Sequence, residues 1–372
     1  MRPRPAEPCI VGWSTLSALG AGRRSFADGL LAGAVGRWAA TGHGPPPAGY
    51  PLADIDLPAL VGGASIRTID RMTLMVIATA TMVLDEHPVA GADRPPVGLV
   101  LGTSTGSLAS ITGFLRDTFT GDRPYFVDPK EFPNTVMNGT AGRTAIWHGL
   151  RGLNSTVAAG HNTGLAALRY AGRMIRRGYA TTLLVGAVEE LSEPVAWAAH
   201  RLREDRGDPG PPAPMGEGCA LFLVQDAETA AQWRHRPLAR LADFEFAVTE
   251  PGDRAALTDG LARVIGTVLR RTGVDADRLH LVSLSHSGDP DLDAAESDAV
   301  DRVLGPASGS GSGARRIAAS RHVGNTFSAL GAFQVAAAIA VAESEGPNTT
   351  ERPAIVTSIG VDGTVACALI TL

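Results

Sequence analysis

A histidine in a tight, glycine-flanked turn is the first residue of this chain that is placed to do chemistry. An apolar stretch leads into the turn Gly160–Gly164 and a helix rich in small residues follows it, so His161 is expected at that helix's N-terminus. The unpaired backbone N–H groups and the dipole there favour an anion and lower the pKa of an imidazole. His161 is therefore expected to be neutral and able to donate or accept one proton. A histidine that merely fills the helix N-terminus explains the same pattern.

A second histidine, His286, directly follows the apolar run His280–Ser285 and opens the loop HSGDPDLDAAE. The run predicts a strand, and the carboxyl ends of strands are where α/β sheets commonly assemble their sites. From position alone, a functional and a purely structural role are equally consistent with His286.

Thiol, metal and lysine chemistry find little support in the sequence. The three cysteines, Cys9, Cys219 and Cys367, each lie inside or beside an apolar, strand-like run. They form no CxxC pair, and no histidine stands at metal-ligand spacing, so we expect neither a disulfide nor a metal site. A single lysine, Lys130, occurs in a loop-like segment, which makes a Schiff-base mechanism unattractive.

Charge and hydropathy exclude other classes of protein. The net charge is −5 and no Lys/Arg cluster is interleaved with aromatic residues, so nucleic acid is not an expected partner. The chain does not open with a charged segment followed by an apolar one, and its longest mostly apolar run, Leu330–Ala342, has 13 residues and contains Gln334. We therefore expect no export signal, no membrane span and a cytoplasmic protein.

Short apolar runs alternate with longer stretches of helical period, which predicts an α/β protein with buried strands. The expected strands are Cys9–Trp13, Val97–Gly102, Thr181–Val185, Cys219–Val224, His280–Leu284, Ala354–Ile359 and Val365–Ile370. The expected helices are Asp70–Leu84, Gly164–Arg177, Asp253–Thr272, Leu292–Leu304 and Phe327–Ala342.

An internal repeat connects two of these helices. Their starts share a residue pattern at a fixed offset: Asn162, Thr163 and Ala166 recur as Asn325, Thr326 and Ala329. Both copies follow a glycine and precede a strand-like run. We therefore expect two similar halves, residues 1–235 and 236–372.

The order of motifs resembles that of a β-ketoacyl synthase over nearly the whole chain. The motifs are IVGWSTLSALG at the start, GEGCALFLV from Gly216, SHSGDPDLDAAESDAV from Ser285, SRHVGNTFSALGA from Ser320 and SIGVDGTV from Ser358. The resemblance implies an α/β, thiolase-like, five-layered αβαβα fold made of two pseudo-symmetric halves.

Three of the four catalytic positions that the resemblance implies are changed. The family holds its acyl chain on a cysteine thiolate, and two histidines and a lysine complete its site. Here His161 stands at the cysteine position and Asn325 at that of the second histidine, while Ser320 replaces the lysine. His286 corresponds to the first histidine. Since an acyl-imidazole is more labile than a thioester, we expect that this chain does not carry the growing acyl group.

The glycine-rich gating loop near the C-terminus is also only partly kept. Gly360 and Gly363 are retained, whereas Val361 and Asp362 replace the phenylalanine and glycine that the family usually has. The loop is thus a remnant of the family's pattern.

A chain that keeps the family's sequence pattern around the site but lacks the nucleophile resembles the chain-length factor of type II polyketide synthases. A chain-length factor is a ketosynthase homologue that pairs with an active ketosynthase. This resemblance implies a heterodimer, an acyl carrier protein that brings the phosphopantetheine, and no cofactor bound by this chain itself. It also implies a dimer-contact segment at 134–145, with Asn134, Met137, Asn138 and Arg143. The short chain favours a reducing, polyene-type system.

Two alternatives stay open at this point. His161 and His286 could face one another in a stand-alone enzyme that decarboxylates, dehydrates or isomerises carrier-bound acyl chains. A homodimeric acyl-binding protein without a ketosynthase partner is the third possibility.

Overall fold

The strands form a long sheet whose order is duplicated. The computed structural model describes residues 6–39, 49–52, 55–62, 66, 68–89, 95–207, 213–306, 313–346 and 351–372. Outward from the centre, the N-terminal half of the 11-stranded sheet has β1 (Pro8–Ser17), β8 (Gly218–Asp226), β6 (Thr182–Glu189), β4 (Gly98–Gly102) and β5 (Asn154–Val157). The C-terminal half has β9 (Ala239–Val248), β13 (Thr364–Thr371), β12 (Pro353–Ile359), β10 (Leu281–Ser283) and β11 (Arg315–Ile317).

The pairing is the same in both halves. From the centre outward each half pairs antiparallel, antiparallel, parallel and parallel. The halves join where β1 and β9 pair through Cys9 with Arg240 and Ile10 with Ala239. Short β2 (Gly20–Ala21) extends the sheet beside β1, and β3 (Gly49–Tyr50) pairs separately with β7 (Met215–Gly216).

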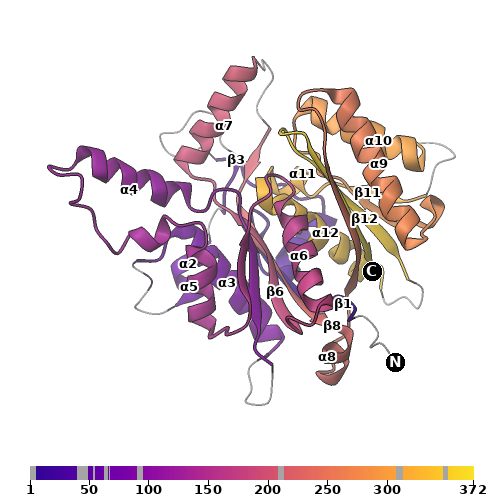
Figure 1. Cartoon of the computed structure of the whole chain (residues 1–372), viewed down its shortest axis with the longest axis horizontal. Coiled ribbons are helices and arrows are strands. Elements are labelled where there is room, and N and C mark those ends of the chain that lie inside the picture. The colour runs from indigo at the N-terminus through magenta and orange to yellow at the C-terminus, as the bar shows by residue number, and fades with distance from the viewer. Residues whose placement is uncertain are drawn as a thin grey trace.

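Helices fill three layers around the two halves of the sheet, as Figure 1 shows. The middle layer is α6 (Thr163–Arg176) and α12 (Leu330–Ser344). One outer layer is α3 (Arg71–Glu86) with α5 (Gly139–His148), and the other is α9 (Arg254–Thr272) with α10 (Pro290–Leu304). This is the thiolase-like, five-layered αβαβα arrangement of two pseudo-symmetric halves that the motifs imply.

The remaining helices are peripheral and shorter on average. They are α1 (Arg23–Leu31), α2 (Leu57–Val61), α4 (Leu108–Thr120), α7 (Glu193–Arg206), α8 (Ala227–Gln232) and α11 (Ser320–Val323), with the 3-10 turns η2 (Phe132–Asn134), η3 (Ala276–Arg278) and η4 (Phe327–Ala329). Figure 1 shows α4 and α7 projecting away from the layers, and α4 has no buried residue.

Strand periodicity explains the layering. In β8 the side chains of Cys219, Leu221 and Leu223 pack against the outer helix α3, while Ala220 and Phe222 face the middle layer. Successive side chains of a strand point to opposite faces, so a strand buried on both sides must be apolar at every position. This is why the strands of the core appear in the sequence as continuous apolar runs.

The middle helix α12 is apolar on all sides because it is buried on all sides. The stretch Phe327–Ser344 is long and apolar enough to cross a membrane by length and composition, and 78% of it is buried inside the protein. Its one buried amide, Gln334, donates to Ser283 O at 2.9 Å and to Thr357 O at 2.8 Å. The polar residue in this run thus ties α12 to β10 and β12.

The two middle helices meet backbone to backbone. A Cβ on Gly164 of α6 would lie 2.6 Å from Ala332 N of α12, and a Cβ on Gly331 would lie 3.1 Å from Leu165 Cγ. Glycine at each of these places therefore allows an approach that a side chain would prevent.

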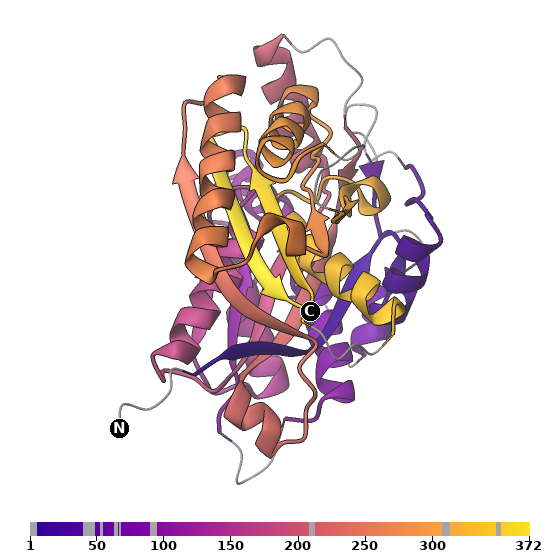
Figure 2. The same ribbon diagram turned by 90° about the vertical axis from the view of Figure 1, so that its right-hand side faces the viewer.

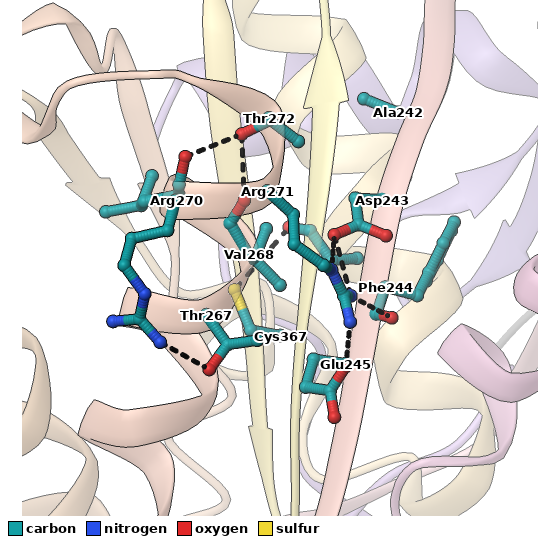
Figure 3. A network of polar contacts seen from close by, with 12 residues as sticks. Ala242, Asp243, Phe244, Glu245, Thr267, Val268, Arg270, Arg271, Thr272 and Cys367 are labelled. Atoms are coloured by element: carbon teal, nitrogen blue, oxygen red, sulfur yellow. Dashed lines mark hydrogen bonds and ion pairs between the residues drawn. The ribbon is translucent and has the colours of Figure 1, made fainter.

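The outer helix α9 is fixed to β9 by one arginine, shown in Figure 3. Arg271 donates to Asp243 Oδ2 at 2.7 Å, to Glu245 Oε2 at 2.5 Å and to Phe244 O at 3.0 Å. Asp243 and Glu245 alternate with apolar residues along β9. This alternation is why the sequence analysis missed β9, which is not a continuous apolar run.

The expected strands and helices are all present, with bounds that differ by a few residues, whereas β5, β11 and α5 were not expected. The proposed division at residue 235 lies in the connection between α8 and β9.

Replacing Gly164 with alanine tests the contact between the two middle helices. Since the added Cβ meets backbone atoms that cannot move independently, Gly164→Ala should lower the free energy of unfolding by about 1–3 kcal/mol. Gly113→Ala is the matched control, because nothing lies within 4 Å of a Cβ there and α4 is exposed. The control should be neutral or stabilising by up to about 1 kcal/mol. Urea unfolding measures both, and equal behaviour of the two variants contradicts the close contact.

Candidate functional site

The turn that carries His161 is held by the first residue of α6. Thr163 Oγ1 donates to Gly160 O at 2.7 Å and accepts from Ala159 N at 2.8 Å. Gly160 has φ +55°, a conformation that favours glycine. The turn leaves β5 and enters α6 with His161 half-buried just before the helix N-cap, Asn162. The expected position of His161 at the start of a buried helix is therefore confirmed.

The equivalent turn of the C-terminal half lies against this one. The ring of Phe327 packs against the imidazole of His161 with 5.8 Å between centroids. Phe327 has φ +46°, and its N–H donates to Asn325 Oδ1 at 2.9 Å. The backbone of Asn325 is held by Pro214 O at 2.7 Å and Gly216 N at 2.8 Å. The fold thus brings His161 and Asn325 into one region, where Phe327 provides an aromatic wall.

The glycine-rich loop between β12 and β13 reaches the same turn. A Cβ on Gly160 would lie 3.0 Å from Asp362 Oδ2, so this carboxylate sits against the turn. The other oxygen, Oδ1, accepts from Thr364 N at 3.1 Å and Thr364 Oγ1 at 2.6 Å. Gly360 N donates to Thr364 O at 2.8 Å, while Gly363 has φ +82° and donates to Gly360 O. Val361 is the remaining residue of this loop. Its side chain packs against the apolar core between the C-terminal half of the sheet and the outer helices α9 and α10.

A buried glutamate, Glu189, connects two loops next to the site through hydrogen bonds. Glu189, at the end of β6, accepts from Ser104 N at 2.5 Å and Ser104 Oγ at 2.6 Å, and it also accepts from Ser328 Oγ. Burial raises the pKa of Glu189, and these donors oppose that effect. Because Ser328 follows Phe327, the carboxyl group fixes the aromatic wall relative to the loop after β4.

His286 lies where β10 ends, as expected, but its side chain serves a different region. Its Nε2 is 3.1 Å from Ser297 Oγ, and that hydroxyl donates to Asp293 O at 2.8 Å. Since the hydroxyl proton is used, Nε2 of His286 is the donor. Burial lowers the pKa of His286; Asp293 opposes this, and Arg321 and Arg316 add to it.

The backbone of His286 is clamped on both sides. Its N–H donates to Glu296 Oε2 at 2.9 Å, and its carbonyl accepts from Ser320 Oγ at 2.7 Å. Glu296 is fully buried and also accepts from Ser285 and Thr357. Ser320, at the family's lysine position, therefore supports the loop. His286 has φ +37°, a strained conformation for a residue with a side chain.

The described cavity that His286 lines has no contribution from His161. The cavity that His286 lines is bounded by residues of α1, β11, α11 and α12, and His161 is not among the described residues that line it. A direct acid–base pair of the two histidines, the alternative left open by the sequence, finds no support in this geometry.

None of the three cysteines is positioned as a nucleophile. Cys9, Cys219 and Cys367 are free, buried in β1, β8 and β13. Burial raises the pKa of Cys9 to about 11 and that of Cys219 to about 12, and it also raises the pKa of Cys367. A thiolate is the reactive form of cysteine, so these thiols are inert at neutral pH.

The expected dimer-contact segment is only partly on the surface. Met137 and Asn138 are exposed. Asn134, in contrast, is 6% exposed and donates to Thr68 O and Glu131 Oε2. Arg143 also donates to Thr68 O, at 2.6 Å. Asn134 therefore stabilises the segment from inside, which differs from the expectation that it faces a partner.

Large apolar side chains are exposed within this segment and on both sides of it. They are Leu115, Phe119, Tyr125, Phe126, Phe132, Val136, Met137, Ile146 and Trp147. Ile146 and Trp147 lie on α5, which packs beside strand β5, while Leu115 and Phe119 lie on the projecting helix α4. Strand β5 ends the sheet and pairs only with β4 in the described part of the chain. We call these residues together with β5 the apolar edge.

Several site residues escaped the sequence analysis. Phe327, Glu189 and Glu296 have no recognisable motif of their own, although Phe327 lies two residues after Asn325. A carboxylate at the end of an apolar strand, as in Glu189, is the one feature of the sequence that could have indicated a buried polar contact.

Duplicated sheets around two buried helices, with a site at the N-terminal turn of one of them, define a thiolase-like protein. Residues 7–204 match the family model described as beta-ketoacyl synthase, N-terminal domain. The structure of the ishigamide ketosynthase/chain length factor has a TM-score of 0.86 and 33% identity, covering 98% of this chain and 99% of that chain. The chain belongs to the β-ketoacyl synthase family.

Two further relatives agree with this assignment. A polyketide beta-ketoacyl synthase 2 of Streptomyces halstedii is 27% identical over 363 residues, which are 92% of this chain and 86% of that protein. A type II polyketide synthase acyl-carrier protein in complex with its ketosynthase gives a TM-score of 0.80 at 17% identity, covering 99% of this chain and 100% of that chain. At this identity the likeness concerns the fold alone.

Next to Glu189, Glu190 fixes the start of the projecting helix α4. It accepts from Ala109 N at 2.9 Å and from Ser107 Oγ at 3.3 Å. Burial raises the pKa of Glu190 to about 7, and the carboxylates of Asp70 and Glu217 contribute.

This pKa predicts a dependence of stability on pH. Between pH 4.5 and 7 the unfolded chain ionises Glu190 while the folded chain does not, so this residue's contribution to stability falls as pH rises and is constant above 7. Glu190→Gln removes that loss. The variant should gain about 3 kcal/mol relative to the natural chain from pH 4.5 to 7.5, measured by urea unfolding. If the difference in stability between the variant and the natural chain stays the same across this pH range, the prediction is wrong. Glu193→Gln, which removes an exposed carboxylate on α7, is the control.

Proposed function

We propose that this chain is a non-condensing partner subunit in type II polyketide biosynthesis. It pairs with an active β-ketoacyl synthase, helps to shape the acyl tunnel and helps to set the chain length, in a system of the reducing, polyene type. An acyl carrier protein presents the acyl chain on its phosphopantetheine, so this subunit needs no cofactor of its own. We place it in the cytoplasm.

The observation that carries this proposal is the imidazole of His161 at the N-terminal turn of α6. Condensation needs a thiolate that holds an acyl group as a thioester. The three cysteines are buried in strands with raised pKa values and lie outside this turn. An acyl group on His161 would be too labile to serve as a store for a growing chain.

The electrostatics of the turn support the same conclusion. Decarboxylation and acyl transfer both develop negative charge on oxygen, which preorganised donors must stabilise. Here the carboxylate of Asp362 sits against Gly160, beside the helix N-terminus. A carboxylate beside the helix N-terminus opposes the build-up of negative charge on a substrate oxygen there.

The apolar edge supports a partner subunit. An end strand with unpaired backbone groups is a template for pairing with another chain, and a large exposed apolar patch marks an interaction site. Among the relatives, the ishigamide protein is described as a ketosynthase/chain length factor and shares 33% identity with this chain. We assign the apolar edge to the active ketosynthase.

The alternative of a stand-alone enzyme requires His161 and His286 to act on one substrate. His286 donates through Nε2 to Ser297 and lines a cavity without His161. The observed geometry therefore favours the partner subunit over this alternative.

Co-expression with candidate ketosynthases tests the proposal. Native mass spectrometry should find a heterodimer, and turnover of malonyl-carrier protein by this heterodimer should persist in His161→Ala, because the imidazole takes no part in the chemistry. Retained turnover is the readout of this test. A chain that stays alone or self-pairs, and releases CO₂ only when His161 is present, overturns the proposal in favour of the enzyme.

A charge placed in the apolar edge should break the pairing. Ile146 is 82% exposed on α5, beside β5. Ile146→Glu should weaken the heterodimer at least tenfold, as burying an unpaired carboxylate costs about 2 kcal/mol or more. Tyr179→Glu, at an exposed position beyond the far end of α6, is the control and should leave the dissociation constant unchanged. If Ile146→Glu and Tyr179→Glu bind the ketosynthase with equal affinity, the assignment of the interface is wrong.

A further inference from the structure

The cavity lined by His286 has the features of a separate ligand site. It has a volume of about 360 Å³, within the range of small-molecule sites, and lies between α1, β11 and α11. Beside this cavity α1 packs against α12, and Figure 2 shows indigo N-terminal ribbon beside the gold C-terminal helix. The proposed pairing at the apolar edge does not involve this cavity.

The cavity is held open by contacts between α11 and the segment after α1. His322 Nδ1 is 2.6 Å from Ala34 O, and Gly36 N donates to His322 O at 2.8 Å. Arg316 also lines the cavity and is fixed by Asp301 Oδ1 at 2.5 Å and Gly305 O at 2.8 Å. The walls are therefore preorganised.

Two further arginines give the cavity a positive charge. Arg315 of β11 and Arg321 of α11 are exposed and line it. Among the described residues neither forms an ion pair, and no described carboxylate lines the cavity. A guanidinium binds carboxylate or phosphate through paired, charge-assisted hydrogen bonds.

The rest of the lining is mainly apolar. Leu30 and Leu31 of α1 face the cavity together with Leu284 and Val341. Leu31, the last residue of α1, is 42% exposed. An exposed leucine beside exposed arginines offers both an apolar and an ionic contact to one ligand.

We infer that this cavity binds a small amphiphilic anion, in which a short alkyl chain carries a terminal carboxylate or phosphate. The oxyanion is held between Arg315 and Arg321, and the alkyl chain lies against Leu30 and Leu31. A free carboxylic acid and a phosphate ester share this chemistry, and the probes below distinguish them.

Calorimetric titration of the full chain tests the inference with hexanoate, hexyl phosphate, hexanol and inorganic phosphate. Hexanoate or hexyl phosphate should bind at least tenfold more tightly than hexanol and inorganic phosphate, because only they combine both contacts. The tighter of the two identifies the headgroup. Binding of hexanol as strong as that of both anions overturns the inference, as does the absence of binding by both.

Single-residue variants show whether the ligand binds in this cavity. Arg321→Gln and Arg315→Gln should each weaken binding about tenfold, while Arg116→Gln, at an exposed position on α4, should not. Leu31→Ser should weaken it too, with Leu60→Ser as the matched control, since both leucines are 42% exposed. Because all these side chains are exposed, the variants should fold, and circular dichroism checks this. Equal effects of the cavity variants and their controls overturn the inference. None of these results depends on whether the chain pairs with a ketosynthase.

Discussion

The contact between α6 and α12 is the constraint on which the rest of the structure depends. At Gly164 and Gly331 the two helices approach so closely that a Cβ on either glycine would meet atoms of the other helix. Because the two helices lie so close together, the inner faces of both half-sheets can pack on one thin helical layer. Close packing of the interior requires such an arrangement. It also sets the site, because the turn that carries His161 and the turn that carries Phe327 lead into these two helices.

Buried glutamates organise the loops around that contact. Glu189 in the N-terminal half and Glu296 in the C-terminal half are each removed from water and surrounded by hydroxyl and backbone donors. A buried polar group is costly unless its hydrogen bonds are made, so each glutamate holds its loop in one conformation. In both halves a buried glutamate thus holds a loop at the corresponding end of the sheet.

The residues around His161 form a packed turn region in the structure. His161 is held by a well-ordered turn, and Phe327 and Asp362 pack around it. Ser320 no longer supplies a charge but supports the backbone of His286. A site rebuilt in this way is suited to filling space at an interface between subunits, in line with the proposed role as a partner, and it leaves His286 to a separate cationic cavity.

The sequence by itself determined the layered α/β fold, since strands buried on both faces must be apolar throughout and α12 must be apolar on every side. Motif order also indicated that His161 stands at the position of the family's cysteine, and this stays a prediction. Strand β9 escaped, since its charged residues alternate with apolar ones and are paired with Arg271 of a distant helix. Only the tertiary structure decided where His286 points, that Asn134 lies inside, and that Arg315 and Arg321 share a cavity with Leu31. Those facts depend on contacts between residues far apart in the chain, which no local pattern encodes.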